Sequence, residues 1–231
     1  FSGKSAFVLG VARQLMAANQ EIRFGKPLAT SFEFGLQAGP PPSTTGSFID
    51  DDVRFVGETL GLSEKQLIPS LDLLASASAD KRLTESDLDA GSGLEALRKQ
   101  LEAPFDGLNI LEAAGSLHEG LLYGLSLGQL ARKFDAQVIL VHLWKDSCSV
   151  DALLAAKEQL GKSLVGIVLN AVTPDEVKTL KRSVVPSLEA LGFVVVGVMP
   201  RSPLLRSVTV GELIRRLEAR VICCPERIEL M

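Results

Sequence analysis

The chain has 231 residues, a formal net charge of -4, 46% hydrophobic residues and 23% charged residues. This apolar fraction excludes a disordered chain and is typical of one globular domain, with a second one started. The negative charge argues against a nucleic-acid or membrane-surface binder, and no apolar run reaches the roughly 18 residues that span a bilayer. Because the three cysteines form no C-x-x-C pair or disulfide framework, we expect a cytoplasmic protein.

The first half of the chain contains helices separated by weak segments. Its predicted elements are a helix over residues 5–19, a strand at 22–24, a loop over 31–47, a helix from about 50 to 60, irregular or broken helix over 71–93 and a short helix over 94–101. The loop is rich in Gly, Pro, Ser and Thr, which do not hold regular structure. Three aspartates at residues 50–52 are expected to cap the second helix, because carboxylates favour the first turn.

Four continuously apolar runs mark the second half of the chain. They lie at residues 108–111, 138–141, 164–169 and 193–198, and helical segments over 126–134, 150–160 and 174–191 separate them. Such runs are typical of strands that are buried on both faces, and strands that alternate with helices form parallel sheets. The expected fold class is therefore α/β, with three layers, a mostly parallel sheet and helices on both faces.

The pattern changes from about residue 204. Residues 208–217 have the spacing of an amphipathic helix, and residues 220–224 form a strand-like run. We expect residues 1–203 to form one domain and residues 204–231 to be the start of a second module, cut off at Met231.

The sequence Ser-Gly-Lys-Ser at residues 2–5 runs directly into the first predicted helix. It matches the second half of the phosphate-binding loop G-x-x-x-x-G-K-[ST], whose first glycine and preceding strand we expect before Phe1. Amides of Gly3, Lys4 and Ser5 at a helix N-terminus favour an anion. Lys4 is expected to reach the terminal phosphates, and the Ser5 hydroxyl to ligate Mg²⁺. The alternative is that a common tripeptide precedes this helix by chance.

The other candidate site residues lie near strand ends. Lys26 could neutralise a phosphate or carboxylate at the carboxyl edge of the sheet, or be a solvated turn lysine. The aspartates at 50–52, taken alone, favour a helix cap over a metal site. Glu112 is either an exposed strand-end residue or, with Ser5 and one aspartate, part of a Mg²⁺ shell. Asn170 could read an adenine edge or form a turn.

These segments, in this order, resemble the dethiobiotin synthetase-like P-loop domain. That family includes cobyrinic acid a,c-diamide synthase, and the likeness is greatest to the version found as the N-terminal part of some phosphotransacetylases. The matching stretches are SGKS (2–5), GKPLAT (25–30), DDDVRFVGETLGL (50–62), ILEAAGSLHEG (110–120), VDALLAAKEQLG (150–161), GIVLNAV (166–172) and GVMPRSPLLRSVTVGEL (197–213). The resemblance implies a P-loop NTPase-like fold for residues 1–203 and a DRTGG-type module after it.

The resemblance also implies a Mg-ATP site. Gly3, Lys4 and Ser5 match the phosphate loop. Lys26 matches the lysine that lies beside the substrate and the γ-phosphate, so Lys4 and Lys26 are the expected catalytic residues.

The metal and base contacts follow from the same resemblance. Asp52 and Glu112 match the acidic residues at the Mg²⁺ ion, where Ser5 supplies the hydroxyl ligand. Asn170 matches the asparagine that reads adenine. One departure is Ala113, where the family has glycine directly after the glutamate; its Cβ is expected to crowd a backbone that approaches the ligand.

Three functions remain open at this point. The first is a Mg-ATP-binding module that regulates or assembles a larger protein. The second is an ATP-dependent carboxylate-activating ligase, although the substrate-recognition region of dethiobiotin synthetase has no clear match. The third is a degenerate scaffold that has lost nucleotide and mediates protein interaction. Analogy with the family suggests a homodimer, and neither nucleic acid nor membrane is an expected partner.

Overall fold

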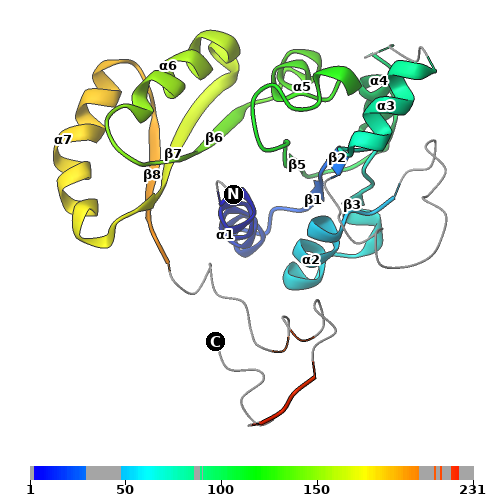
Figure 1. The fold of residues 1–231 in the computed structure, drawn as a ribbon, viewed down its shortest axis with the longest axis horizontal. Helices are drawn as coiled ribbons and strands as arrows, with labels where there is room; N and C mark the ends of the chain where they lie inside the picture. The colour runs from blue at the N-terminus through cyan, green and yellow to red at the C-terminus, as the bar shows by residue number, and fades with distance from the viewer. Residues whose placement is uncertain are drawn as a thin grey trace.

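The computed structural model describes residues 3–29, 48–85, 89, 91–202, 211, 214 and 220–223. Its helices are α1 (Lys4–Ala17), α2 (Asp51–Leu60), α3 (Ser76–Thr84), α4 (Ser92–Leu101), α5 (Leu127–Phe134), α6 (Ser149–Leu160) and α7 (Val177–Ala190) (Figure 1). Its strands are β1 (Ile22–Gly25), β2 (Leu28–Ala29), β3 (Leu67–Ile68), β4 (Asp72–Leu73), β5 (Leu108–Leu111), β6 (Val138–Leu143), β7 (Leu164–Val172) and β8 (Val195–Pro200). The predicted loop over 31–47 lies outside the described residues.

The longer predicted elements are confirmed. The helix expected over residues 5–19 is α1, and the four apolar runs of the second half are β5, β6, β7 and β8. The prediction missed β2, β3 and β4, which have two residues each and therefore carry no periodic signal. Of these, β4 lies inside the segment that was expected to be irregular or helical. Of the strand-like run at 220–224, the described residues 220–223 are not in a strand.

All strand pairs within the sheets are parallel, in three separate ladders. Their orders are β3-β1-β5, β2-β4 and β6-β7-β8. Parallel strands flanked by helices confirm the expected α/β class. In the part of the chain that the structure describes, no strand pair joins β5 to β6, so these residues alone do not complete the expected single sheet.

The ladder β3-β1-β5 has helices on both faces. On one side, Phe24 of β1 packs against Val53 and Val56 of α2, and Ile110 of β5 joins this cluster. Leu111 of β5 belongs to a second cluster, which also holds residues of α4 and α5. Because consecutive residues of a strand point to opposite faces, the two clusters lie on opposite sides of this ladder.

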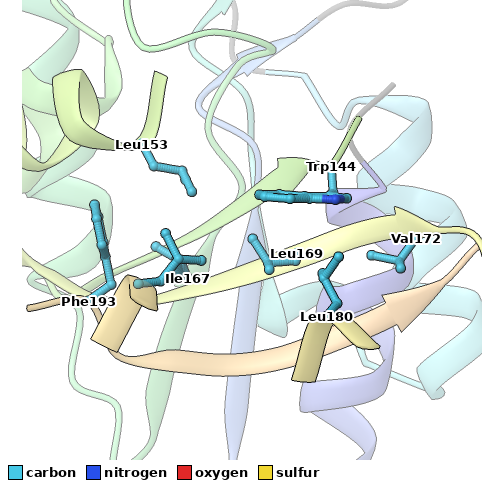
Figure 2. Packing of buried hydrophobic residues seen from close by; sticks show 8 residues of the cluster. Trp144, Leu153, Ile167, Leu169, Val172, Leu180 and Phe193 are labelled. Carbon is cyan, nitrogen blue, oxygen red and sulfur yellow. The ribbon is translucent and has the colours of Figure 1, made fainter. Parts of the chain in front are cut away.

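Helices α6 and α7 cover one face of the ladder β6-β7-β8. Leu153 of α6 and Leu180 of α7 pack with Ile167 and Leu169 of β7 in one buried cluster (Figure 2). Only residues 166–169 of β7 are buried in succession, as a strand with two covered faces requires. Burial on both faces was also expected for the runs of β5, β6 and β8. Residues of these three runs are instead partly exposed, because a continuous apolar run reports side-chain polarity and not how completely each face is covered.

His142 on β6 gives a prediction for the pH dependence of stability. Burial lowers its pKa, and its Nε2 atom is buried without a hydrogen-bond partner among the described residues. The unfolded chain therefore takes up a proton near pH 6.5 that the folded protein takes up only at lower pH, so acid favours unfolding. We expect the urea midpoint of the wild type to fall more steeply between pH 7 and 5 than that of His142→Leu. Equal slopes in the two proteins would contradict this role.

No helix in the described ranges combines the length and the apolar character that crossing a membrane requires.

Candidate functional site

The phosphate-loop candidate lies at the N-terminus of α1. Gly3 is the residue that precedes the helix, and its φ of 80° is in the left-handed region that favours glycine. The helix starts with Lys4 and Ser5, has no acidic residue in its first turn and has no side-chain cap among the described residues. The positive end of the helix dipole is therefore not neutralised by a carboxylate of its own first turn.

Glu112 faces this helix start. The Ser5 hydroxyl donates a hydrogen bond to Glu112 Oε1 over 3.2 Å, and the Glu112 amide donates to the Gly25 carbonyl over 2.8 Å, which holds the residue beside β1. Only 6% of Glu112 is exposed, and its second oxygen, Oε2, is buried with no hydrogen-bond partner in the described part of the chain. The reading of Glu112 as an exposed strand-end residue is therefore wrong.

The electrostatic environment of Glu112 combines several groups of the site. Burial raises the pKa of its carboxyl group, and the Asp52 charge acts in the same direction. The charges of Lys4 and Lys26 and the hydrogen bond from Ser5 lower it. A carboxylate oxygen that is buried without a hydrogen-bond partner among the described residues costs free energy, so this position favours a nearby positive charge.

Lys26 lies in a buried cluster with two carboxylates. Its Nζ atom is 2.5 Å from Asp52 Oδ2 and 3.6 Å from Asp50 Oδ1, and the side chains of Lys26, Asp50 and Asp52 are 6%, 2% and 54% exposed. The alternative of a solvated turn lysine is therefore wrong.

The two aspartates of this cluster differ. Asp50 accepts a hydrogen bond from the Asp52 amide over 2.8 Å and caps α2, as the aspartates at 50–52 were expected to do. Sequence reasoning missed that Asp50 is also a buried partner of Lys26, because a capping residue is ordinarily exposed. Asp52 keeps its carboxylate at the surface, where it can change partner.

Asn170 lies against the start of α1. A Cβ atom built on Gly3 would be 2.1 Å from the Asn170 side-chain nitrogen, so the close approach of the two residues requires glycine at this position. Asn170 is on β7, in the ladder that does not contain β1 and β5. The structure thus brings the predicted site residues of both ladders together around the N-terminus of α1.

The tripeptide Gly-Lys-Ser occurs a second time, at Gly161–Ser163. This copy follows the C-terminal end of α6 and leads into β7. A helix C-terminus carries partial negative charge and presents carbonyl groups, which repel phosphate. The tripeptide is thus no signal by itself; its position at the N-terminus of α1 makes Gly3, Lys4 and Ser5 a candidate anion site.

The residues present fit a magnesium ion that a nucleotide helps to hold. Among the described residues, no group of three or more His, Cys, Asp or Glu side chains is placed to hold a metal ion alone. Mg²⁺, however, usually binds through one or two carboxylates together with phosphate oxygens and water. Ser5, Asp52 and Glu112 offer one hydroxyl and two carboxylates, and the unpaired Oε2 atom of Glu112 is a free oxygen ligand.

A comparison with known protein families identifies the family of the chain. A family model described as an AAA domain matches residues 1–209, which include every predicted site residue. The family is one of P-loop NTPases and is related to dethiobiotin synthetase-like proteins. Proteins of this kind generally bind a nucleotide together with Mg²⁺. The chain belongs to this AAA-domain family of P-loop NTPases.

Proposed function

We propose that this chain is a Mg-ATP-binding, dethiobiotin-synthetase-like domain that regulates or assembles a larger protein. The hydrogen bond from the Ser5 hydroxyl to buried Glu112 carries this proposal. It joins the candidate phosphate loop directly to a carboxylate whose second oxygen has no partner among the described residues. The proposed phosphate site and the proposed divalent-cation site would then be adjacent, as Mg-ATP requires.

Each site residue has a role in this proposal. Lys4 and the first amides of α1 bind the terminal phosphates, while Ser5, Asp52 and Glu112 hold the metal. Asn170 binds the adenine edge through its amide, which both donates and accepts hydrogen bonds. When bound, the ion neutralises phosphate charge.

The regulatory role is supported by what the chain lacks relative to the family it resembles. The substrate-recognition region of dethiobiotin synthetase has no clear counterpart in the sequence. Ala113 stands where the family has glycine next to the metal glutamate. The first departure affects turnover of a second substrate more directly than it affects binding of ATP. Ala113, next to the metal glutamate, bears on ligand binding itself and favours the degenerate scaffold instead.

The burial of Lys26 favours a second candidate, an ATP-dependent carboxylate-activating ligase. A substrate carboxylate oxygen would attack the γ-phosphorus and ADP would leave, while Lys4 and Lys26 stabilise charge on the transferred group. Steady ATP-dependent product formation by the full protein would exclude a purely regulatory role. Unchanged turnover after Lys26→Ala would exclude the catalytic role of that lysine.

The test of Mg-ATP binding compares the two Gly-Lys-Ser tripeptides: the one at residues 3–5 is the proposed site, and the one at Gly161–Ser163 is the matched control. Mg-ATP at about 100 times its Kd is expected to raise the free energy of unfolding of the wild type by about 2.7 kcal/mol, as measured by urea denaturation. EDTA and the Lys4→Ala substitution should each abolish this gain, whereas Lys162→Ala should retain it. Absence of any gain in the wild type would favour the degenerate scaffold. A gain in Lys4→Ala as large as that of the wild type would mean that the nucleotide binds elsewhere.

A further inference from the structure

Strand β7 contains one residue more than its neighbour β8 matches. From Leu169 to Val172 the chain of β7 advances by three residues, whereas their partners on β8 advance from residue 198 to residue 200, that is, by two. Within the described strands, Ala171 is paired with no residue of β6 or β8. An extra residue of this kind is a β-bulge, and we call this one the Ala171 bulge.

The packing of β7 shows the same extra residue. Ile167, Leu169 and Val172 all belong to the buried cluster under α6 and α7 (Figure 2). Alternate residues of a regular strand share a face, so the residue that follows Leu169 on this face would be Ala171. Val172 takes this place instead, and the chain between Leu169 and Val172 is free to serve another purpose.

The backbone hydrogen bonds reverse at the bulge. The Asn170 carbonyl accepts a hydrogen bond over 2.9 Å from the amide of Trp144, the residue directly after β6. The Val172 carbonyl accepts one over 2.7 Å from the amide of Arg201, the residue directly after β8. In a regular strand the carbonyl groups of residues i and i+2 point to the same neighbour, so Ala171 turns the backbone over.

Ala171 makes this turn in an unfavourable conformation. Its φ of 59° is in the left-handed region, which residues with a Cβ atom rarely adopt. Strain of this kind persists only where the surrounding structure holds it, and it collects at ligand sites. A bulge also bends its strand and re-aims the side chains beside it. The side chain directly before Ala171 is that of Asn170, which lies against Gly3.

The Asn170 amide has a defined orientation at this place. Its nitrogen atom is nearer than its oxygen atom to the position of a Cβ on Gly3, at 2.1 Å against 3.8 Å. Adenine carries an amino group that donates where guanine carries a carbonyl that accepts. An amide that could turn over would exchange its own donor and acceptor and bind either base. Discrimination between the two bases therefore requires that the orientation of Asn170 is held.

We propose that Ala171 is a positioning residue for Asn170, and that its bulge sets the preference of the nucleotide site for adenine over guanine. This inference rests on the proposed function, in which the Asn170 amide binds the adenine edge. The bulge holds that amide beside Gly3, so that one orientation of its donor and acceptor faces the base.

The test compares the Kd of Mg-ATP with the Kd of Mg-GTP in the wild type and in Ala171→Val. Valine is β-branched and does not tolerate the left-handed region, so it displaces the bulge and releases the Asn170 amide. We expect the wild type to prefer ATP, and Ala171→Val to weaken this preference about tenfold, which corresponds to one hydrogen bond. Binding of inorganic triphosphate with Mg²⁺, which involves no base, should stay unchanged.

Two controls separate a positioning role from a merely structural one. Asn170→Ala should also weaken the preference for ATP, and adding Ala171→Val to it should weaken it no further, because both changes act on one side chain. Asn19 has a φ of 58° and lies just beyond the C-terminal end of α1. Asn19→Val therefore introduces the same kind of strain away from the site and should leave the preference for ATP unchanged.

Ala171→Gly keeps the proposal falsifiable if Ala171→Val does not fold. Glycine tolerates the left-handed region, so this variant should have a higher urea midpoint than the wild type and retain the preference for ATP. A lower midpoint would overturn the strained bulge. A wild type without a preference for ATP, or a preference that Ala171→Val retains, would overturn the inference and leave Mg-ATP binding standing. A wild type that binds neither nucleotide would overturn the proposed function and this inference with it.

Discussion

Replacing Lys26 with Met is expected to lower the free energy of unfolding by about 3–5 kcal/mol. The lysine and Asp50 are both buried, with Nζ and Oδ1 3.6 Å apart, so the substitution leaves a buried carboxylate without the lysine that neutralises it. Asp52 is half-exposed and stays hydrated, and its pairing with Lys26 therefore adds little to stability. Urea unfolding at neutral pH without nucleotide measures this effect apart from any ligand.

A double variant provides the control for this prediction. Asp50→Asn keeps a side-chain oxygen that can accept a hydrogen bond from the Asp52 amide at the start of α2, but removes the negative charge of the carboxylate. Adding it to Lys26→Met should recover most of the lost stability, whereas Asp52→Asn alone should cost less than about 1 kcal/mol. If Lys26→Met costs no more than Asp52→Asn, the lysine is not held in a buried ion pair.

Gly3→Ala is expected to remove about 4 kcal/mol of stability in the presence of Mg-ATP. About 1–2 kcal/mol comes from forcing an L-residue into the left-handed conformation of Gly3. The added methyl group also meets the Asn170 amide at 2.1 Å and displaces it or the loop, so the gain of about 2.7 kcal/mol from Mg-ATP at about 100 times Kd is lost. Urea titrations with and without Mg-ATP separate the two contributions.

Gly10→Ala is the matched control on the same helix. Gly10 lies inside α1, and a Cβ atom there has nothing within 4 Å. Alanine at this position should stabilise the protein by about 0.5–1 kcal/mol and leave the Mg-ATP effect intact. A Gly3→Ala protein that responds to Mg-ATP like the wild type would show that the N-terminus of α1 is not the phosphate site.

The sequence predicted the elements that carry a long periodic signal. The apolar spacing of α1 and the β-branched run of β7 are local features, and both are found where expected. The capping of α2 by Asp50 was predictable for the same reason, because a cap depends on residues that are adjacent in the chain. The two-residue strand β3 depends on its pairing with β1, which no local pattern encodes.

The burial of the candidate site could not be read from the sequence. Whether Lys26 and Glu112 are solvated depends on segments far away in the chain, such as Asp50 for the lysine and Ser5 for the glutamate. Lys26 and Glu112 were chosen as candidate site residues because they are charged and lie at strand ends. The sequence left open that each of them is solvated. In the structure both side chains are buried, while the roles of these residues with nucleotide and metal stay predictions.

The division of the strands into separate ladders has a consequence for how the protein opens. Gly3 and Glu112 lie with β1 and β5, whereas Asn170 belongs to β7, and in the described residues no strand pair joins the two ladders. Units without shared backbone hydrogen bonds can unfold locally as separate cooperative units. A nucleotide bound as proposed would contact Gly3 and Asn170 at once and add to the close approach of these two residues, so that β6-β7-β8 would open less readily while the ligand is bound.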